Sequence, residues 1–323
     1  MPDVKHLLSS KVSLAPMAGV TDYVLRSLVR EYSPDCLLTT EMISSEALTQ
    51  VRDTSITARA ENHSPISYQL SGHKPKMIAD CAEYLQKYAD MIDINMGCPV
   101  NKVVKGTDGA ALMRNMDLAA EIVKTVKSQI KIPLSVKFRL GYTADEMNYV
   151  EFGQRMQNAG ADFITIHART RSQMYNGKAD WKKIAVLKHN IDIPVFANGD
   201  INSPEAAEQC LLESQADGVA VGRGILGDPS LIYRIDRYIN KGEFIKTPTL
   251  EEKIIEVKKH LMQEIGFRGE DVGIKFTRKF YPYYINGFQG ASKFRRELVT
   301  CNNRKKIYEL LDEILFETTH KIC

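Results

Sequence analysis

The feature that most constrains the fold of this chain is a regular alternation of short apolar runs with helix-like segments. Strands that alternate with helices form a parallel sheet, and eight units of this size fit a closed α/β barrel of the (β/α)₈ (TIM) type better than an open doubly wound sheet. Ser203 and Pro204 predict one helix start in this pattern, as N-cap and first helical residue. The eight predicted strands are residues 12–17, 36–40, 66–70, 91–96, 134–140, 163–168, 195–197 and 218–221.

The pattern changes after the eighth predicted strand, where helical periodicity replaces the alternation. Thr249 and Glu252 have the spacing of a capping box, and the apolar residues that follow them recur at helical intervals. No further run has the character of a strand. We therefore expect a barrel over residues 1–243 and a small all-helical domain over residues 244–323.

Residues 222–227 match the pattern G-x-G-x-x-G directly after the last predicted strand. In a Rossmann fold this pattern binds a dinucleotide, but that fold needs further parallel strands downstream, and none is predicted here. The eighth strand of a barrel commonly ends in a phosphate-binding turn. We therefore expect the backbone N–H groups of Gly222 and Arg223, together with the Arg223 guanidinium, to hold a mononucleotide phosphate.

Five consecutive predicted strands carry a polar residue near their carboxyl ends, where barrel enzymes place their chemistry. Strand alternation allows these side chains to share the barrel interior. A buried lysine is costly without a partner, and a flavin ring offers one because its N1 and C2 carbonyl region becomes anionic on reduction. An ion pair between Lys137 and Asp93 is the alternative. The five residues are Gln69, Asn95, Lys137, His167 and Asn198.

Cys98 is the best-placed cysteine, because it follows the strand that carries Asn95, in a loop shaped by Gly97 and Pro99. An unperturbed thiol is mostly protonated at neutral pH, so Cys98 suits proton donation as well as nucleophilic attack. The six cysteines are scattered and contain no Cys-x-x-Cys pair. We therefore expect neither a disulfide framework nor a metal site.

The positive charge of the chain lies toward its C-terminus. The sequence has 43 Lys and Arg against 40 Asp and Glu, and from Lys241 onward the ratio is 16 to 12. Between residues 268 and 306, ten basic residues are interleaved with aromatic ones. This mixture suits a nucleic-acid backbone, and it equally suits a solvated helical face over an aromatic core. With no apolar stretch of membrane-spanning length, we expect a soluble, cytoplasmic protein. We also expect a monomer.

Six segments resemble, in order, the signature motifs of the tRNA-dihydrouridine synthase family, and the chain looks most similar to its bacterial B-type branch. The resemblance covers nearly the whole chain. It implies reduction of the C5–C6 double bond of uridine in tRNA to 5,6-dihydrouridine, with bound FMN as the flavin and NADPH as the reductant. The segments are residues 14–22, 93–99, 105–112, 136–141, 167–171 and 198–200.

The resemblance also implies roles for individual residues. Cys98 corresponds to the family's catalytic acid, which protonates C5, while Asn95 and His167 would orient the uracil. Lys137 would lie near the flavin ring. The residues expected to bind FMN are Pro16, Met17, Ala18, Gln69, Lys137, His167, Asn198, Gly199, Asp200, Gly222 and Arg223.

RNA contacts are expected from Arg171 and from four residues of the basic segment. One departure concerns that segment, because many family members carry Arg-Lys-His where this chain has Phe280 after the Arg-Lys pair, which leaves the local RNA contact open. Three alternatives also stay open: a flavin barrel acting on a free pyrimidine such as dihydroorotate, an RNA-binding protein with a catalytically idle barrel, and a Schiff-base lyase. The four basic candidates are Arg278, Lys279, Arg295 and Arg296.

Overall fold

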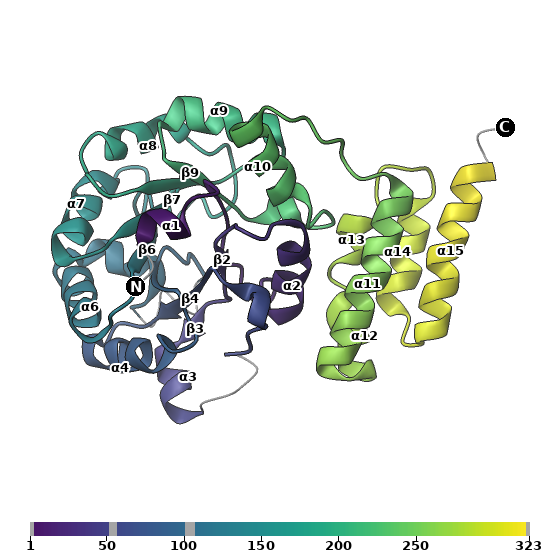
Figure 1. The fold of residues 1–323 in the computed structure, drawn as a ribbon, viewed down its shortest axis with the longest axis horizontal. Coiled ribbons are helices and arrows are strands. Elements are labelled where there is room, and N and C mark those ends of the chain that lie inside the picture. The colour runs from purple at the N-terminus through teal and green to yellow at the C-terminus, as the bar shows by residue number, and fades with distance from the viewer. Residues whose placement is uncertain (1–2, 52–56, 101–106, 321–323) are drawn as a thin grey trace.

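The computed structural model describes residues 3–51, 57–100 and 107–320. Its barrel is one parallel sheet of strand order β1-β9-β8-β7-β6-β5-β4-β2, with the short β3 beside β4 (Figure 1). The sheet closes where the backbone N–H of Leu14 donates to the carbonyl of Leu37 at 2.9 Å. The strands are β1 (Val12–Leu14), β2 (Leu38–Thr39), β3 (Ile43–Ser44), β4 (Ile66–Ser71), β5 (Met91–Met96), β6 (Leu134–Arg139), β7 (Phe163–His167), β8 (Val195–Asn198) and β9 (Gly218–Val221).

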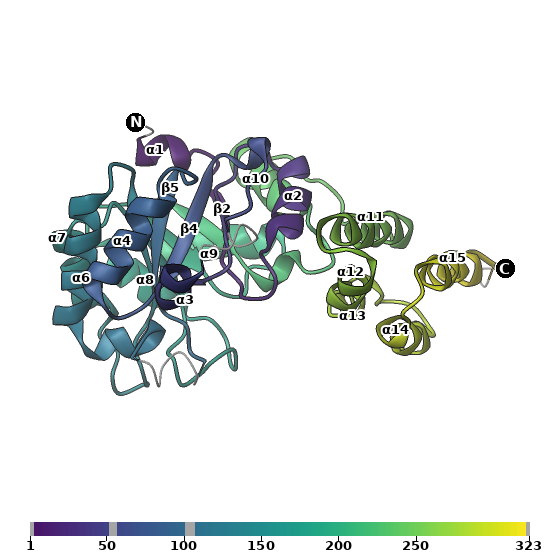
Figure 2. The ribbon, with the colours of Figure 1, turned by 90° about the horizontal axis from the view of Figure 1, so that it is seen from below.

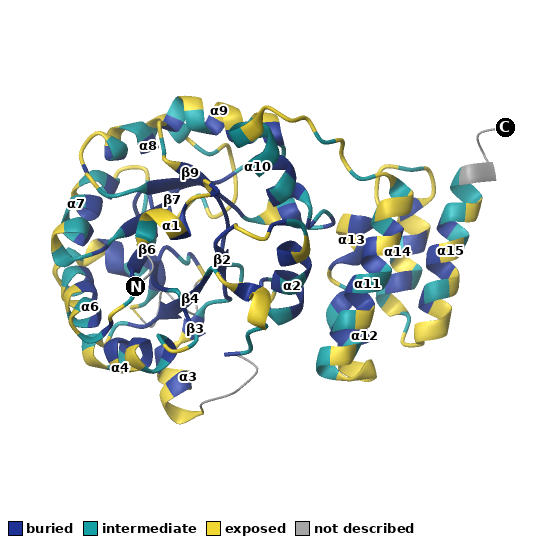
Figure 3. Cartoon of the chain, viewed as in Figure 1, coloured by how far each residue is buried: buried dark blue, intermediate teal, exposed yellow. Residues whose placement is uncertain are grey.

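The predicted barrel is confirmed, because each of the eight apolar runs overlaps one strand of the sheet. Among the described residues, β3 is the one strand without a predicted counterpart, since two residues are too few to give a pattern. The strands are buried nearly throughout (Figure 3). Helices cover the outer face of the sheet, and side chains fill its interior.

Helices follow the strands around the barrel. The predicted start at Ser203 is confirmed, because its hydroxyl accepts the N–H of Ala206 at 3.1 Å and Pro204 is the first helical residue. The larger helices are α2 (Tyr23–Tyr32), α4 (Pro75–Leu85), α6 (Met116–Gln129), α7 (Tyr149–Ala159), α8 (Trp181–Lys188), α9 (Pro204–Ser214) and α10 (Leu231–Lys241), and the shorter elements are α1 (Val4–Leu7), α3 (Ser45–Gln50), η1 (Glu61–His63), η2 (Gly109–Arg114) and η3 (Arg223–Ile225).

Apolar side chains close the end of the barrel where the strands begin. Leu7 of α1 and the adjacent Leu8 form a buried cluster with Phe163 and Phe196, and Figure 2 shows α1 over this end. The two phenylalanine rings meet edge to face at 5.0 Å. A ligand can therefore enter only from the opposite end, where the strands finish.

The region after α10 is helical, as expected, and the described residues contain no strand beyond β9. The predicted capping box is confirmed, since Thr249 accepts the N–H of Glu252 and the Glu252 carboxylate accepts that of Thr249. These helices share a hydrophobic cluster that includes Val257, Phe280 and Phe294. They are α11 (Leu250–Arg268), α12 (Glu270–Thr277), α13 (Tyr281–Tyr284), α14 (Ala291–Thr300) and α15 (Arg304–His320).

Helix α11 packs against α2 of the barrel (Figure 1). The rings of Tyr23 and Phe267 stack with centroids 4.7 Å apart, and the Tyr32 hydroxyl donates to the Glu256 carboxylate at 2.7 Å. The contact is therefore both apolar and polar. Within the described ranges, no helix is long and apolar enough to cross a membrane.

Candidate active site

A chain of buried hydrogen bonds leads from the barrel interior to the loop that carries Cys98. The Asp93 carboxylate accepts Ser135 Oγ at 2.6 Å and Gln69 Nε2 at 2.7 Å. Gln69 Oε1 accepts Asn95 Nδ2 at 2.9 Å, and Asn95 Oδ1 accepts the backbone N–H of Cys98 at 2.8 Å. Burial raises the pKa of Asp93, while these two donors oppose the shift. The chain therefore fixes the orientation of both amides and the start of the Cys98 loop.

Lys137 lies half-buried on β6, beside this chain. Its ammonium donates to Asn198 Oδ1 at 3.2 Å, and the Asn198 amide donates to the carbonyl of Ala220 at 2.7 Å. The alternative of a Lys137–Asp93 ion pair is not formed among the described residues, because the Asp93 oxygens accept from Ser135 and Gln69. The Lys137 charge still opposes the rise in the pKa of Asp93. Desolvation and the nearby Arg139 lower the pKa of Lys137 to about 8.

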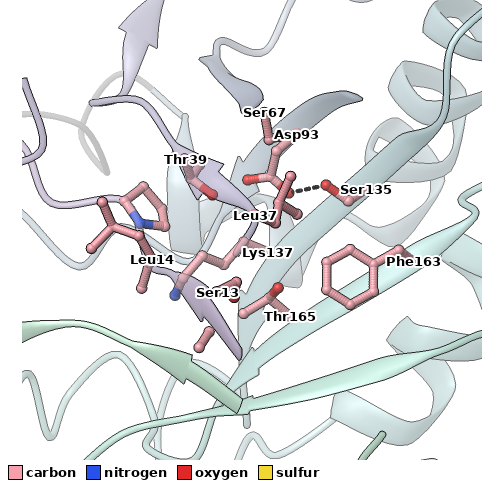
Figure 4. Close-up of a pocket in the computed structure, with 13 residues that line it drawn as sticks. Ser13, Leu14, Leu37, Thr39, Ser67, Asp93, Ser135, Lys137, Phe163 and Thr165 are labelled. Carbon is pink, nitrogen blue, oxygen red and sulfur yellow. Dashed lines mark hydrogen bonds between the residues drawn. The ribbon is translucent and has the colours of Figure 1, made fainter. Parts of the chain in front are cut away.

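Asp93 and Lys137 line a small cavity inside the barrel (Figure 4). Figure 4 shows the hydrogen bond between the Asp93 carboxylate and Ser135. The cavity has a volume of about 10 Å³, the lower limit for one water molecule. It is too small for a substrate, so any ligand must bind above it, at the open end of the strands.

Arg139 braces the loops at that end, a role that the sequence did not reveal. Its Nε donates to the carbonyl of Gly97 at 2.8 Å, and its Nη1 donates to the carbonyls of Thr170 and Met174 at 3.0 and 2.8 Å. Burial lowers the pKa of Arg139 to about 10, so it stays charged at neutral pH. The signal available in the sequence was its position two residues after Lys137, on the same face of β6.

His167 is buried at the end of β7, and its pKa lies well below the ordinary value because burial and the surrounding arginines disfavour a second proton. Its Nε2 lies 3.3 Å from Nη1 of Arg169, which can only donate, so Nε2 accepts and the ring proton sits on Nδ1. A Cβ at Gly199 would approach His167 Cδ2 to 3.0 Å, and φ at this glycine is +120°. Glycine at position 199 therefore leaves room for the His167 ring, which a larger side chain would crowd.

The side chain of Asp200 forms an ion pair that the sequence did not predict. Both of its carboxylate oxygens accept from Arg169 Nη2, at 2.8 and 2.6 Å, and one also accepts the backbone N–H of Ala179 at 2.8 Å. This ion pair anchors the loop after β7, and Arg169 is 1% exposed. The carboxylate is thus committed to the protein, and only the backbone of Asp200 remains for a ligand. The sequence motif gave no reason to prefer Arg169 over Arg171.

Backbone N–H groups gather where β8 and β9 end. Those of Gly199, Asp200, Gly222 and Arg223 have no hydrogen-bond partner within the described residues. The Arg223 side chain is 54% exposed, and its guanidinium lies 4.0 Å from Asp200. Unpaired N–H groups beside an arginine suit a phosphate. The Rossmann alternative is excluded for the described chain, because η3 and helices alone follow this turn.

The turn after β1 lies at the same end of the barrel. Pro16 and Met17 are half-buried, and Ala18 is exposed, so this backbone is accessible to a ligand. Thr21 holds the turn, because its hydroxyl accepts the N–H of Met17 at 3.0 Å.

The basic residues expected to contact RNA have unequal surroundings. Arg278 donates to Asn302, Arg295 Nη1 donates to the carbonyl of Ile285 at 2.9 Å, and Lys279 Nζ donates to the carbonyl of Gly19 on the barrel. Arg296 is exposed and has no side-chain partner among the described residues. Arg171 is half-buried, and its guanidinium lies 5.2 Å from the ring centre of Tyr142. Spacing along a helix could not distinguish these environments.

These features place the chain among the α/β-barrel enzymes, whose reactions occur at the carboxyl ends of the strands. A sequence comparison refines this class. The profile of the dihydrouridine synthase family matches residues 13–319, and the chain belongs to that family.

Individual relatives match over nearly their full length. "Probable tRNA-dihydrouridine synthase 1" of Synechocystis sp. is 42% identical over 98% of this chain and 89% of its own. "Probable tRNA-dihydrouridine synthase" of Rickettsia conorii is 36% identical over 95% and 93%. "tRNA-dihydrouridine synthase B" of Pseudomonas aeruginosa is 35% identical over 90% and 89%. The expected family is confirmed, and its relatives include proteins of the B type.

Proposed function

We propose that this chain is a tRNA-dihydrouridine synthase that reduces the C5–C6 double bond of a uridine in tRNA, with FMN as its bound flavin and NADPH as reductant. One observation carries the proposal. The Cys98 loop, fixed by Asn95, shares the open end of the barrel with Lys137 and with a group of unpaired backbone N–H groups. A proton donor and a site for an anionic cofactor therefore lie together.

The described residues fit FMN. The unpaired N–H groups after β8 and β9, with Arg223, would hold its phosphate, and the accessible backbone from Pro16 to Ala18 would line its ring. Lys137 has one side-chain partner and a positive charge for the N1 and C2 carbonyl region. Gln69 and Asn198 would meet the edge of the ring with their remaining amide capacity. When bound, FMN supplies the hydride that it takes from NADPH.

Cys98 completes the reduction as a general acid. Its S–H bond breaks, the proton goes to C5 of the uracil, and the thiolate regains a proton from solvent. Asn95 and Arg139 hold the loop from two sides, so the thiol meets the substrate from a fixed position.

His167 and Asn95 would orient the uracil. Because the low pKa of His167 keeps the imidazole neutral at physiological pH, it acts as a hydrogen-bonding group and not as a second acid. The neutral ring suits the amide-like edge of uracil, which has both donors and acceptors.

The RNA contact falls to the basic helical region, residues 244–323, while residues 1–243 carry the chemistry. A uridine in folded RNA must leave its stack to reach a flavin, at a cost of a few kcal/mol, and phosphate contacts can offset that cost. Arg296 is exposed and has no side-chain partner among the described residues, and Arg171 lies near the barrel mouth. A tRNA substrate also implies a cytoplasmic enzyme, and the monomeric state stays a prediction.

The proposal is tested by a visible spectrum of the purified protein, followed without oxygen by NADPH and then by unmodified tRNA. We expect flavin bands that bleach with NADPH and return only with tRNA. Bands that bleach and respond to dihydroorotate or free uracil, but not to tRNA, would favour a small-molecule oxidoreductase. A protein that binds tRNA but cannot be loaded with FMN would be an RNA-binding protein with an idle barrel.

A further inference from the structure

The turn from Pro16 to Asp22 links β1 to α2 and is tied to the helical region. Lys279 Nζ donates to the carbonyl of Gly19, and Arg268 Nη2 donates to the carboxylate of Asp22. Between these two points, Val20 packs against the hydrophobic cluster of the helical region as well as against that of the barrel. The helical region thus contacts the turn that borders the proposed flavin site, through Arg268 and Lys279.

The Asp22 contact is buried and already shared. One oxygen of Asp22 accepts the N–H of Leu25 at 3.0 Å and caps α2, while the other accepts from Arg268. Arg268 Nε also donates to Glu264 Oε2 at 2.7 Å, and Asp22 and Glu264 are 3% and 0% exposed. One guanidinium therefore serves two buried carboxylates, one from each part of the chain.

Removing that guanidinium would leave two buried carboxylates facing each other. Burial and mutual repulsion raise the pKa of Asp22, and burial raises that of Glu264. His260 lies 3.7 Å from Glu264 but cannot replace the arginine, since burial lowers its pKa to about 4 and leaves it neutral. Unpaired buried charges are costly, so the turn would shift or the joint would open.

We propose that Arg268 and Lys279 are positioning residues, which hold Gly19 and Asp22 so that the Pro16–Ala18 backbone is preset for the cofactor. The inference deepens the proposed function and rests on it for the identity of that cofactor. It reassigns Lys279, which sequence reasoning gave to RNA. Neither cation belongs to the barrel itself, so the shape of the flavin site depends on the helical region.

The test compares Arg268→Gln and Lys279→Gln with Lys259→Gln in the full chain. Lys259 is a matched control, because it also joins α11 to α2, through Glu31, but does not touch the turn. Two quantities are measured: the FMN dissociation constant of the stripped protein, from flavin fluorescence, and hydrogen exchange of the amides of residues 17–22. We expect Arg268→Gln and Lys279→Gln to weaken FMN binding about five- to tenfold and to speed exchange in the turn. Lys259→Gln should change neither, and Arg268→Lys should recover part of the affinity.

An equal loss of FMN affinity in Lys259→Gln would overturn the inference, since general docking of the helices would then explain the effect. So would unchanged exchange and affinity in both Arg268→Gln and Lys279→Gln. If Arg268→Gln does not fold, the FMN affinity and hydrogen exchange of Lys279→Gln test the inference, because this substitution changes an exposed side chain and the protein should still fold. A wild-type protein that takes up no FMN would refute the proposed function, while hydrogen exchange in the turn would still test the positioning.

Discussion

The side-chain oxygen of Asn95 accepts the backbone N–H of Cys98 at 2.8 Å, so a residue inside the barrel sets the position of a thiol outside it. The same oxygen accepts the N–H of Gly97 at 3.1 Å. A loop held in this way presents its thiol without having to reorganise during the reaction.

Cys98→Ala should keep bound flavin and its reduction by NADPH, because Cys98 contacts neither the phosphate site nor Lys137 through a hydrogen bond. Reduction of uridine should slow by about 10² to 10⁴-fold, as expected for a lost general acid. Single-turnover reoxidation of the reduced enzyme by tRNA measures this step. Near-normal reoxidation would remove Cys98 from the mechanism.

Asp93→Ala should lower the free energy of unfolding by about 1–3 kcal/mol, because it leaves a buried amide N–H of Gln69 without an acceptor. Asp93→Asn is the matched control. Its amide can still accept from Gln69, while the Ser135 hydroxyl can turn toward the carbonyl of Ile92, 3.4 Å away. Urea denaturation of the two variants gives the comparison, and equal losses would contradict this account of the hydrogen-bond chain.

The affinity for FMN should fall as pH rises through about 8, where Lys137 of the free protein loses its proton. The sign follows from the charge: the ammonium favours an electron-rich ring edge, and the neutral amine does not. If only the protonated form binds well, each further pH unit reduces the affinity up to about tenfold. Titration of the stripped protein with FMN between pH 6.5 and 9.5 measures it. In Lys137→Arg this decline should disappear, because a guanidinium keeps its charge over the range.

Arg296→Gln should weaken tRNA binding and lower the slope of log affinity against log salt by about one, as for the loss of one phosphate contact. Lys279→Gln should change that slope less, because Lys279 already donates to Gly19. Filter binding at several salt concentrations separates the two. Equal slopes of log affinity against log salt in the two variants would indicate that Lys279 also contacts the RNA.

Local patterns predicted the fold because each strand and cap depends on neighbouring residues. Ser203 and the Thr249–Glu252 pair lie within three residues of the groups they bond. Strand periodicity likewise predicted that Gln69, Asn95 and Lys137 would meet. It could not give the direction of each hydrogen bond, which decided that Asp93 faces Ser135 and not Lys137.

The sequence did not predict side-chain contacts whose partner lies far along the chain. The Asp200 carboxylate is held by Arg169, 31 residues away, and Lys279 bonds Gly19 from 260 residues away. The cofactor contact of Asp200 and the RNA contact of Lys279 stay predictions. Charge density identifies a basic segment but not which of its members the fold uses internally. Only the tertiary arrangement distinguishes Lys279 from Arg296.

The stacking of Tyr23 on Phe267 and the bonds of Arg268 and Lys279 make the two parts of the chain members of one thermodynamic cycle. Any ligand that changes the free energy of this joint when it binds one part must alter affinity at the other by the same factor, and the effect is reciprocal. With FMN on the barrel and tRNA on the helical region, as proposed, binding of the cofactor would then change the affinity for tRNA before any reaction begins.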